Sequence, residues 1–156
     1  MDATHGPRTF DRLADLAALE GQLIGTSGWT LVDQARIDRF AQATGDAQWI
    51  HVDPARAAAG PFGTTVAHGF LTLSLLSELV VGAFRVAEAR MGLNYGLNRV
   101  RFPSPVPVGS RLRAECRLLK FEPIDGGAQL TIEMSVQREG GTKPACVAEW
   151  VTRHFV

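Results

Sequence analysis

Apolar and polar positions follow two different periods along this chain. Between residues 111 and 118, and again between 128 and 137, apolar and polar side chains alternate one by one. This period of two is typical of half-buried strands. Glycine-containing turns at 125–127 and 140–141 occur where hairpins would connect such strands. The two further strands that we expect in the same sheet span residues 94–102 and 145–155.

The first third of the chain is mainly helical by pattern. We expect a short helix over Thr9–Glu20, followed by an interrupted extended segment over Gln22–Val32. Asp33 is a suitable N-cap for a second helix, and Gly45 is a suitable C-terminal stop. Asp53-Pro54 is a further start signal, for a brief helix. The positions that form one apolar face of the second helix are Ile37, Phe40, Ala41 and Thr44.

A longer helix is expected from Gly69 to about Ala89. Its leucine, valine and phenylalanine residues lie on all sides, so we expect protein to surround it. Its most apolar part is short for a membrane span and contains Glu78, which argues against membrane insertion. An antiparallel sheet curled around this helix gives an α+β fold. No repeat or linker interrupts the chain, so we expect one domain over residues 1–156.

Composition narrows the class of protein further. The 156 residues carry 16 basic and 16 acidic side chains, which does not fit a nucleic-acid binder with a basic surface. The two cysteines, Cys116 and Cys146, form no CxxC motif, so a structural zinc site or a disulfide framework is not expected. The first 20 residues carry charges and have no apolar run typical of a secretion signal. We therefore expect a cytoplasmic protein.

One loop region concentrates titratable side chains between glycine and proline residues. Taken separately, Asp46 can be explained as a turn residue after the helix-ending Gly45, and His51 as a histidine packed in the interior. Taken together, a carboxylate and an imidazole within reach of one water molecule would form a hydration or dehydration centre. Asp53 is better explained as a helix cap. The pair Asp46 and His51 is therefore the candidate catalytic set.

Gly69 is the second candidate in this region. As the first residue of the long helix it has a backbone N–H without a helical partner, suited to a thioester carbonyl that gains enolate character. The alternative is that glycine only avoids a steric clash there. His68 is interpreted as structural. A metal site built from His51, Asp53 and His68 lacks a recognised ligand spacing, so we expect no metal.

Arginines are frequent between residues 99 and 117. The simpler interpretation is a solvated face of strands, and the alternative is a site for a phosphate-bearing ligand. The residues concerned are Arg99, Arg101, Arg111, Arg113 and Arg117.

Residues 43–75 resemble the hydratase-2 motif of MaoC-like dehydratases, the (R)-specific enoyl-CoA hydratases of the hotdog fold. The family pattern has a G-D-x-N-P-x-H-x-D segment and a later A-H-G. Residues 95–112 resemble the strand and connector that follow the central helix in this family. The two departures are Gln48, where asparagine is usual, and Trp49, where proline is usual. The matching residues are Gly45, Asp46, His51, Asp53, Ala67, His68 and Gly69.

The resemblance implies a hotdog fold and reversible hydration of a trans-2-enoyl thioester to an (R)-3-hydroxyacyl thioester. Asp46 and His51 would activate one water, and Gly69, with Gln48, would bind the substrate. The thioester itself acidifies C2, so no metal or organic cofactor is implied. Acyl-CoA or an acyl carrier protein is the implied partner, together with a second copy of the chain. Arg99 or Arg101 is a candidate contact for the carrier's phosphates.

Two other functions remain open at this stage. A hotdog acyl-CoA thioesterase would share the fold and the ligand, but such enzymes place an acidic residue on the central helix. Glu78 lies too far along the helix to meet Gly69 easily. A non-catalytic acyl-thioester-binding protein would not need both Asp46 and His51. The departures at positions 48 and 49 leave the preferred acyl chain open.

Overall fold

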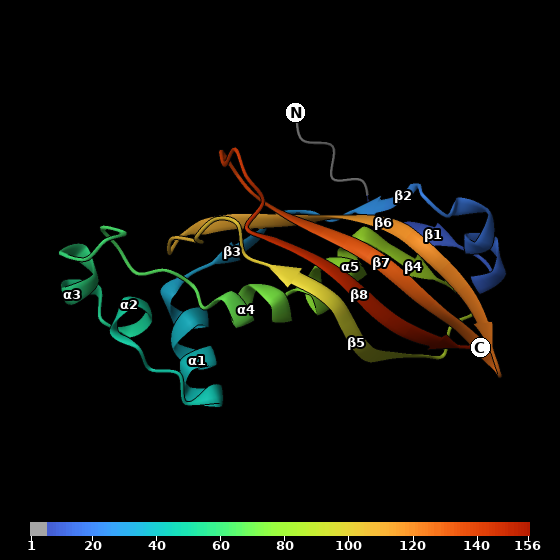
Figure 1. Cartoon of the computed structure of the whole chain (residues 1–156), viewed down its shortest axis with the longest axis horizontal. Coiled ribbons are helices and arrows are strands. Elements are labelled where there is room, and N and C mark those ends of the chain that lie inside the picture. Colours follow the sequence, from blue (N-terminus) through green and yellow to red (C-terminus); the bar gives the residue numbers. More distant parts are fainter. Residues whose placement is uncertain (1–5) are drawn as a thin grey trace.

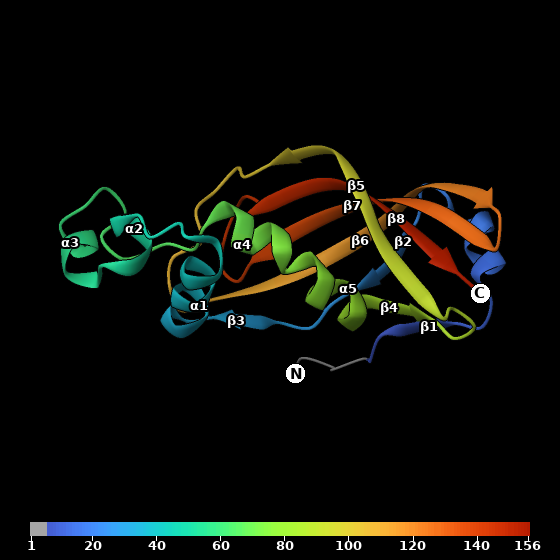
Figure 2. The same ribbon diagram turned by 90° about the horizontal axis from the view of Figure 1, so that it is seen from below.

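A curved antiparallel sheet covers one side of a central helical segment (Figures 1 and 2). The computed structural model describes residues 6–156. The expected strands are present, and the order across the six-stranded sheet is β2-β6-β7-β8-β5, with β3 beside β6. The strands are β2 (Leu23–Thr26), β3 (Thr30–Val32), β5 (Met91–Arg101), β6 (Ser110–Ile124), β7 (Gly127–Arg138) and β8 (Cys146–Phe155).

The central segment consists of α4 (Gly69–Ser74) and α5 (Leu76–Ala83). Leu75 joins the two helices without interrupting their direction, because its N–H donates to Leu71 O at 3.0 Å and its own carbonyl accepts from Leu79 N–H at 2.9 Å. Figure 2 shows the segment crossing the concave face of the sheet.

The prediction that this helix continues to about Ala89 is wrong. The chain becomes extended at Phe84, where β4 (Phe84–Val86) begins and pairs in parallel with β1 (Arg8–Phe10). The partner strand comes from the start of the chain, so the pattern around residue 84 does not reveal the pairing.

Protein does not surround the helix on all sides in one copy of the chain. Leu76 and Leu79 are buried under the sheet. By contrast, Phe70 is 70% exposed and Val81 is 68% exposed. The sheet covers only one side of the helix, so the expectation of complete enclosure is not met by a single chain.

The predicted helix Thr9–Glu20 is only partly confirmed. Its first residues belong to β1, and a 3-10 helix occupies Leu13–Leu19. The Glu88 carboxylate accepts a hydrogen bond of 2.6 Å from the Leu13 N–H, which fixes the start of this helix. This distant contact, which local periodicity does not reveal, adds to a local one, in which the Asp15 carboxylate accepts from the Arg12 N–H at 3.1 Å.

Three short helices lie at one end of the sheet (Figure 1). The helix α1 (Gln34–Thr44) begins and ends as predicted: the Asp33 side chain accepts from Arg36 N–H at 2.8 Å, and Gly45 adopts a left-handed φ of 80°. Beyond it, α2 (Trp49–Val52) and α3 (Pro54–Ala58) form a projecting unit, which we call the overhang and which spans residues 47–66.

Trp49 forms the centre of the overhang. A Cβ added to Gly60 would lie 2.8 Å from the Trp49 ring, so only glycine allows this close approach. The Arg56 guanidinium lies 4.5 Å from the centre of the same ring. Trp49 therefore packs the overhang together and is not among the residues that line the cavities described below.

The core lies between the sheet and the central helices. The alternating apolar positions of β6 and β7 point inward as predicted, and Leu112 and Ile132 are fully buried. Cys116 and Cys146 are buried and unpaired. Burial raises the pKa of Cys116 to about 12 and that of Cys146 to about 11. Among residues 6–156, no helix has the length and apolar character needed to cross a membrane.

Candidate active site

The loop after α1 presents Asp46. Gly45 ends the helix, with its N–H donating to Ala41 O at 2.8 Å, and the left-handed turn sends the chain away from the helix axis. The Asp46 carboxylate is exposed, while its backbone carbonyl accepts a hydrogen bond of 2.9 Å from His68 Nε2. Because a carbonyl only accepts, Nε2 carries the hydrogen of His68.

His51 lies on α2 and is buried. Its Nδ1 donates to the Val66 carbonyl at 2.6 Å, so the neutral ring keeps a free lone pair on Nε2. Gln34 of α1 fixes the position of α2, because its side-chain amide donates to the His51 carbonyl at 2.8 Å. The Gln34 side-chain oxygen also accepts from the Thr65 hydroxyl. These contacts hold the imidazole in one orientation.

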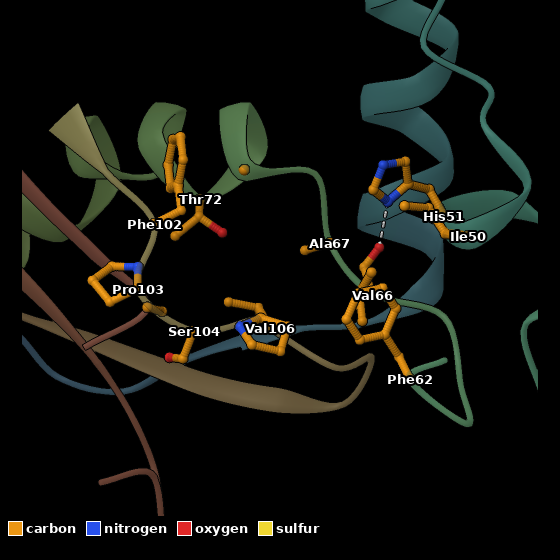
Figure 3. Close-up of a pocket in the computed structure, with 13 residues that line it drawn as sticks. Ile50, His51, Phe62, Val66, Ala67, Thr72, Phe102, Pro103, Ser104 and Val106 are labelled. Atoms are coloured by element: carbon orange, nitrogen blue, oxygen red, sulfur yellow. Dashed lines mark hydrogen bonds between the residues drawn. The ribbon is translucent and has the colours of Figure 1, made fainter. Parts of the chain in front are cut away.

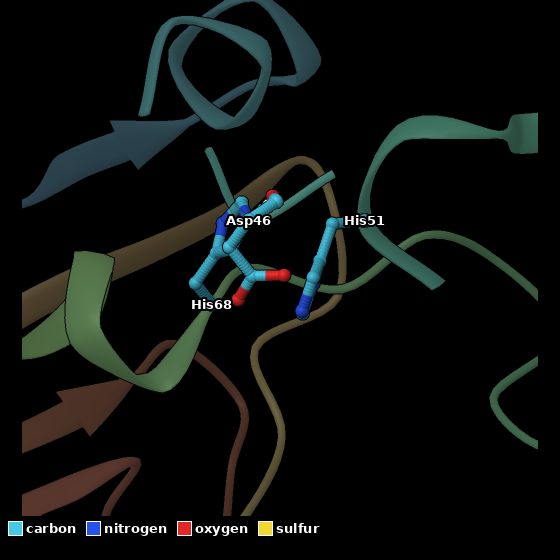
Figure 4. Close-up of side chains that lie close together, drawn as sticks. All are labelled: Asp46, His51 and His68. Atoms are coloured by element: carbon cyan, nitrogen blue, oxygen red, sulfur yellow. Dashed lines mark hydrogen bonds between the residues drawn. The ribbon is translucent and has the colours of Figure 1, made fainter. Parts of the chain in front are cut away.

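Asp46, His51 and His68 come together at the start of α4 (Figure 4). One ligand-type atom from each residue lies within 4.8 Å of the others. The two imidazoles are stacked, with ring centres 3.9 Å apart and planes inclined by 24°. The sequence motif therefore brings one carboxylate and two imidazole rings together.

The stacked rings do not fit a metal site. Imidazole lone pairs lie in the plane of the ring, and an ion about 2.0–2.1 Å from both nitrogens would have to lie in both planes. Two planes inclined by 24° with centres 3.9 Å apart do not meet near the nitrogens. His51 Nδ1 and His68 Nε2 are bonded to backbone carbonyls, so the ring nitrogens that remain are His51 Nε2 and His68 Nδ1, one on each of these inclined rings. Asp53 lies outside the cluster and caps α3 by accepting from Arg56 N–H at 3.0 Å.

An apolar cavity of about 330 Å³ opens beside His51 (Figure 3). The overhang contributes one wall, with Ile50 and Phe62, and the connector after β5 contributes the other, with Phe102 and Pro103. Gly69 and Thr72 of α4 line the cavity as well. A smaller hollow of about 230 Å³ also contains Asp46 and shares three residues with the larger one: His51, Gly69 and Phe102.

Gly69 is the first residue of α4, and the preceding residue, His68, is extended with φ −59° and ψ 140°. Among the hydrogen bonds of residues 6–156, none has the Gly69 N–H as donor. A Cβ at position 69 would lie 3.2 Å from the Phe102 ring. Gly69 thus offers a free backbone donor and leaves the space next to it open.

Known proteins share this sequence and this arrangement. The profile of the MaoC-like domain matches residues 15–139. The chain belongs to the MaoC-like dehydratase family. It is 54% identical over 148 residues to 3-hydroxyacyl-thioester dehydratase Z of Mycobacterium tuberculosis, covering 94% of this chain and 98% of the relative. It is 51% identical over 144 residues to nodulation protein N of Rhizobium leguminosarum bv. viciae, covering 90% and 89%.

Among solved structures, the (R)-hydratase from A. caviae involved in PHA biosynthesis superposes with a TM-score of 0.68 and 26% identity. The match covers 81% of this chain and 92% of that one. The predicted hotdog fold is confirmed.

Of the remaining predicted site residues of this MaoC-like dehydratase, Gln48 lies next to Asp46, whereas the two arginines lie in a separate groove. Gln48 is the exposed N-cap residue of α2, and its backbone N–H donates to the Asp46 carboxylate at 3.4 Å, but the residue lines neither cavity. Arg99 and Arg101 lie on β5, in a separate groove that also contains the carboxylates of Glu133 and Glu149. Their predicted contact with a carrier phosphate stays a prediction.

Sequence reasoning missed several residues that line the cavity of the MaoC-like dehydratase. Thr72 is three positions after Gly69, so helical spacing places both residues on the same side of α4. The sequence therefore contained a signal that could have identified Thr72. Phe102 and Ser104 belong to a proline-rich connector without periodicity, so only the fold brings them to the cavity.

Proposed function

We propose that this chain catalyses the reversible addition of water to a trans-2-enoyl thioester, giving an (R)-3-hydroxyacyl thioester. The observation that carries the proposal is that Asp46, His51 and Gly69 line one hollow, with His51 Nε2 and the Gly69 N–H both free of partners within residues 6–156. The names of its relatives support the same reaction class, since one is a 3-hydroxyacyl-thioester dehydratase and another is an (R)-hydratase.

The reaction needs one water held between the two catalytic groups. His51 Nε2 accepts a hydrogen bond from this water, and the Asp46 carboxylate accepts a second one. The water oxygen forms a bond with C3, while its lost proton returns to the substrate at C2 on the same face. The net change is that one O–H bond of water and the C2=C3 π bond break, while one C–O bond at C3 and one C–H bond at C2 form.

Charge develops on the thioester oxygen as C3 is attacked, and the Gly69 N–H is positioned to donate to it. The apolar cavity beside His51 would hold the acyl chain and keep other water away. Coenzyme A or an acyl carrier protein carries the thioester. Because the thioester acidifies C2, this scheme needs no cofactor and no metal.

The test is to mix purified protein with crotonyl-CoA and follow the ultraviolet absorbance of the conjugated enoyl thioester. We expect the absorbance to fall and chiral analysis to show only the (R)-3-hydroxyacyl product. Release of free thiol would instead indicate a thioesterase. Binding without either reaction, across short and long enoyl chains, would indicate a non-catalytic acyl-thioester-binding protein.

The contacts of Glu78 argue against the thioesterase alternative. Its carboxylate accepts from Arg36 at 2.9 Å and from the Thr30 hydroxyl at 3.0 Å, and it lines neither cavity. We therefore expect Glu78→Gln to keep full hydration activity and to lower stability by at most about 1 kcal/mol, as for an exposed ion pair. Steady-state kinetics and urea unfolding measure both effects. A loss of turnover above tenfold would contradict this assignment.

We propose that the chain functions as a homodimer joined through β5. This strand pairs only with β8 in the described part of the chain, so one long edge lacks a partner. Edge strands with exposed apolar side chains are normally covered. Exposed apolar groups gather on this strand and the adjoining helix and connector: Met91, Leu93, Tyr95, Leu97, Phe70, Val81 and Phe102. A second copy that covers them would also enclose the helix.

We expect Leu93→Glu/Leu97→Glu to convert the protein from dimer to monomer, because two charges would have to be buried in the interface. Light scattering after size-exclusion chromatography measures the mass. The matched control is Leu31→Glu, which alters an equally exposed leucine on β3, away from the β5 edge, and should leave the dimer intact. A dimer that persists in the double variant would rule out this interface.

We further propose that residues 1–156 act as a single MaoC-like domain in the cytoplasm. The family match over residues 15–139 supports the first point. The two unpaired cysteines support the second, because oxidising compartments favour disulfides.

A further inference from the structure

A second concave site lies at the tip of the β7–β8 hairpin. It has a volume of about 410 Å³, and three cationic side chains line it: Arg113, Arg138 and Lys143. No carboxylate is among its lining residues in the described chain. Its walls also include Trp29, Gln137 and Gly141. We call this site the basic pocket.

The charges of the basic pocket are not neutralised by neighbours. Neighbouring Arg111 is paired with Glu139 at 3.1 Å, but no ion pair within residues 6–156 involves Arg113, Arg138 or Lys143. The Nε of Arg138 is buried and has no hydrogen-bond partner there. Three unpaired cations in one concavity create a positive potential that favours an anion. The groove at Arg99 and Arg101, by contrast, has two carboxylates.

The pocket is also held in shape. The Arg113 guanidinium lies 4.6 Å from the centre of the Trp29 ring, and its Nε donates to the Gln137 side chain at 3.0 Å. This leaves the outer guanidinium nitrogens available, which is the arrangement that suits phosphate oxygens. On the hairpin, the Gly141 N–H donates to Arg138 O at 2.9 Å and fixes the turn.

The basic pocket adjoins the catalytic cavity. Lys143 and Pro144 line the basic pocket, whereas the next residue, Ala145, lines the cavity. Ser104, also in the cavity wall, donates its hydroxyl to Pro144 O at 3.0 Å and to Lys143 O at 3.3 Å. One tethered segment therefore separates the two spaces.

We propose that the basic pocket binds the phosphate groups of the nucleotide that carries the thioester, as in an acyl-coenzyme A. This inference rests on the proposed function, because it requires a thioester in the neighbouring cavity. The pocket contributes to the affinity for the carrier, and it lies away from the atoms whose bonds change in the reaction. Its loss therefore weakens binding of a phosphate-bearing substrate and leaves the chemical step unchanged.

The test compares two substrates, crotonyl-CoA and crotonyl-pantetheine, which lacks phosphate. For Arg113→Gln/Lys143→Gln we expect the KM for crotonyl-CoA to rise about tenfold at low ionic strength, with kcat unchanged. The KM for crotonyl-pantetheine should stay the same. The matched control, Arg39→Gln/Arg90→Gln, removes two exposed cations that form no ion pair in the described chain and should change neither KM.

Two results would overturn the proposal. One is an equal rise in the KM for crotonyl-CoA and for crotonyl-pantetheine in the basic-pocket variant, which would indicate a structural role for the substituted residues. The other is a rise in the KM for crotonyl-CoA that appears with Arg99→Gln/Arg101→Gln and not with the basic-pocket variant.

Calorimetry with adenosine 3′,5′-bisphosphate separates this proposal from the proposed function, because it needs no turnover. We expect the wild type to bind this probe and the basic-pocket variant to bind it at least tenfold more weakly. If the wild type and the basic-pocket variant bind the probe equally, the basic pocket is not the phosphate site, even if the protein is an active hydratase. If the wild type binds the probe but hydrates no enoyl thioester, the nucleotide site is supported and the proposed function is contradicted.

Discussion

Replacing Asp46 by asparagine is expected to lower kcat for enoyl-thioester hydration by about 10²–10⁴-fold, the usual contribution of a general acid–base group. The side chain keeps its shape but loses its charge and its ability to take a proton. The fold should not change, because the Asp46 side chain is exposed and its contact with His68 uses the backbone carbonyl. Asparagine also keeps a side-chain oxygen that can accept from the Gln48 N–H, as the carboxylate does at 3.4 Å. Steady-state kinetics with crotonyl-CoA, together with urea unfolding, measure both quantities.

The motif itself provides the matched control. Asp53→Asn makes the same chemical change seven residues later, at a side chain that caps α3 and lies outside the catalytic cluster. Asparagine is an equally good cap, so activity and stability should both stay close to those of the wild type. If Asp46→Asn retains more than a tenth of the wild-type kcat, Asp46 is not the catalytic carboxylate.

Replacing Gly69 by proline is expected to lower kcat by about 10²–10³-fold, the usual cost of removing one donor to a developing oxyanion. Proline deletes the N–H and is well tolerated as the first residue of a helix. The preceding residue also suits a proline, because His68 already has the extended backbone, with φ −59° and ψ 140°, that precedes proline. The helix should therefore form while its free donor is lost.

Gly69→Ala is the control for the added side chain. It keeps the N–H but places a Cβ 3.2 Å from the Phe102 ring, so that the ring has to shift by a few tenths of an ångström. We expect alanine to raise KM with a smaller effect on kcat than proline. Equal losses of kcat for the two variants, in proteins with equal thermal stability, would assign the effect to crowding and not to the lost donor.

Local sequence signals predicted the parts of the fold that are set by local chemistry. The period-two strands, the Asp33 cap and the Gly45 stop are all present as expected. The end of the central helix was not predictable in this way, because β4 forms only through its pairing with β1 at the start of the chain. Strand pairing between distant segments leaves no local pattern.

The candidate site also has a part that a local motif predicted and a part that depends on distant segments of the chain. Asp46, His51 and Gly69 were identified from a motif, and the fold brings them together. The tautomer of His51 was not readable from sequence, because it depends on the Val66 carbonyl of a separate segment. The cavity walls come from the overhang and a connector, and their apolar residues have no periodic spacing.

The burial of the two cysteines has a practical consequence for assays. Cys116 and Cys146 are inaccessible, and their raised pKa values keep both thiols protonated at neutral pH. A thiol-detecting dye should therefore see released coenzyme A without background colour from the folded enzyme. In the absence of substrate, the slow appearance of two dye-reactive groups per chain would follow the rate at which the native state opens.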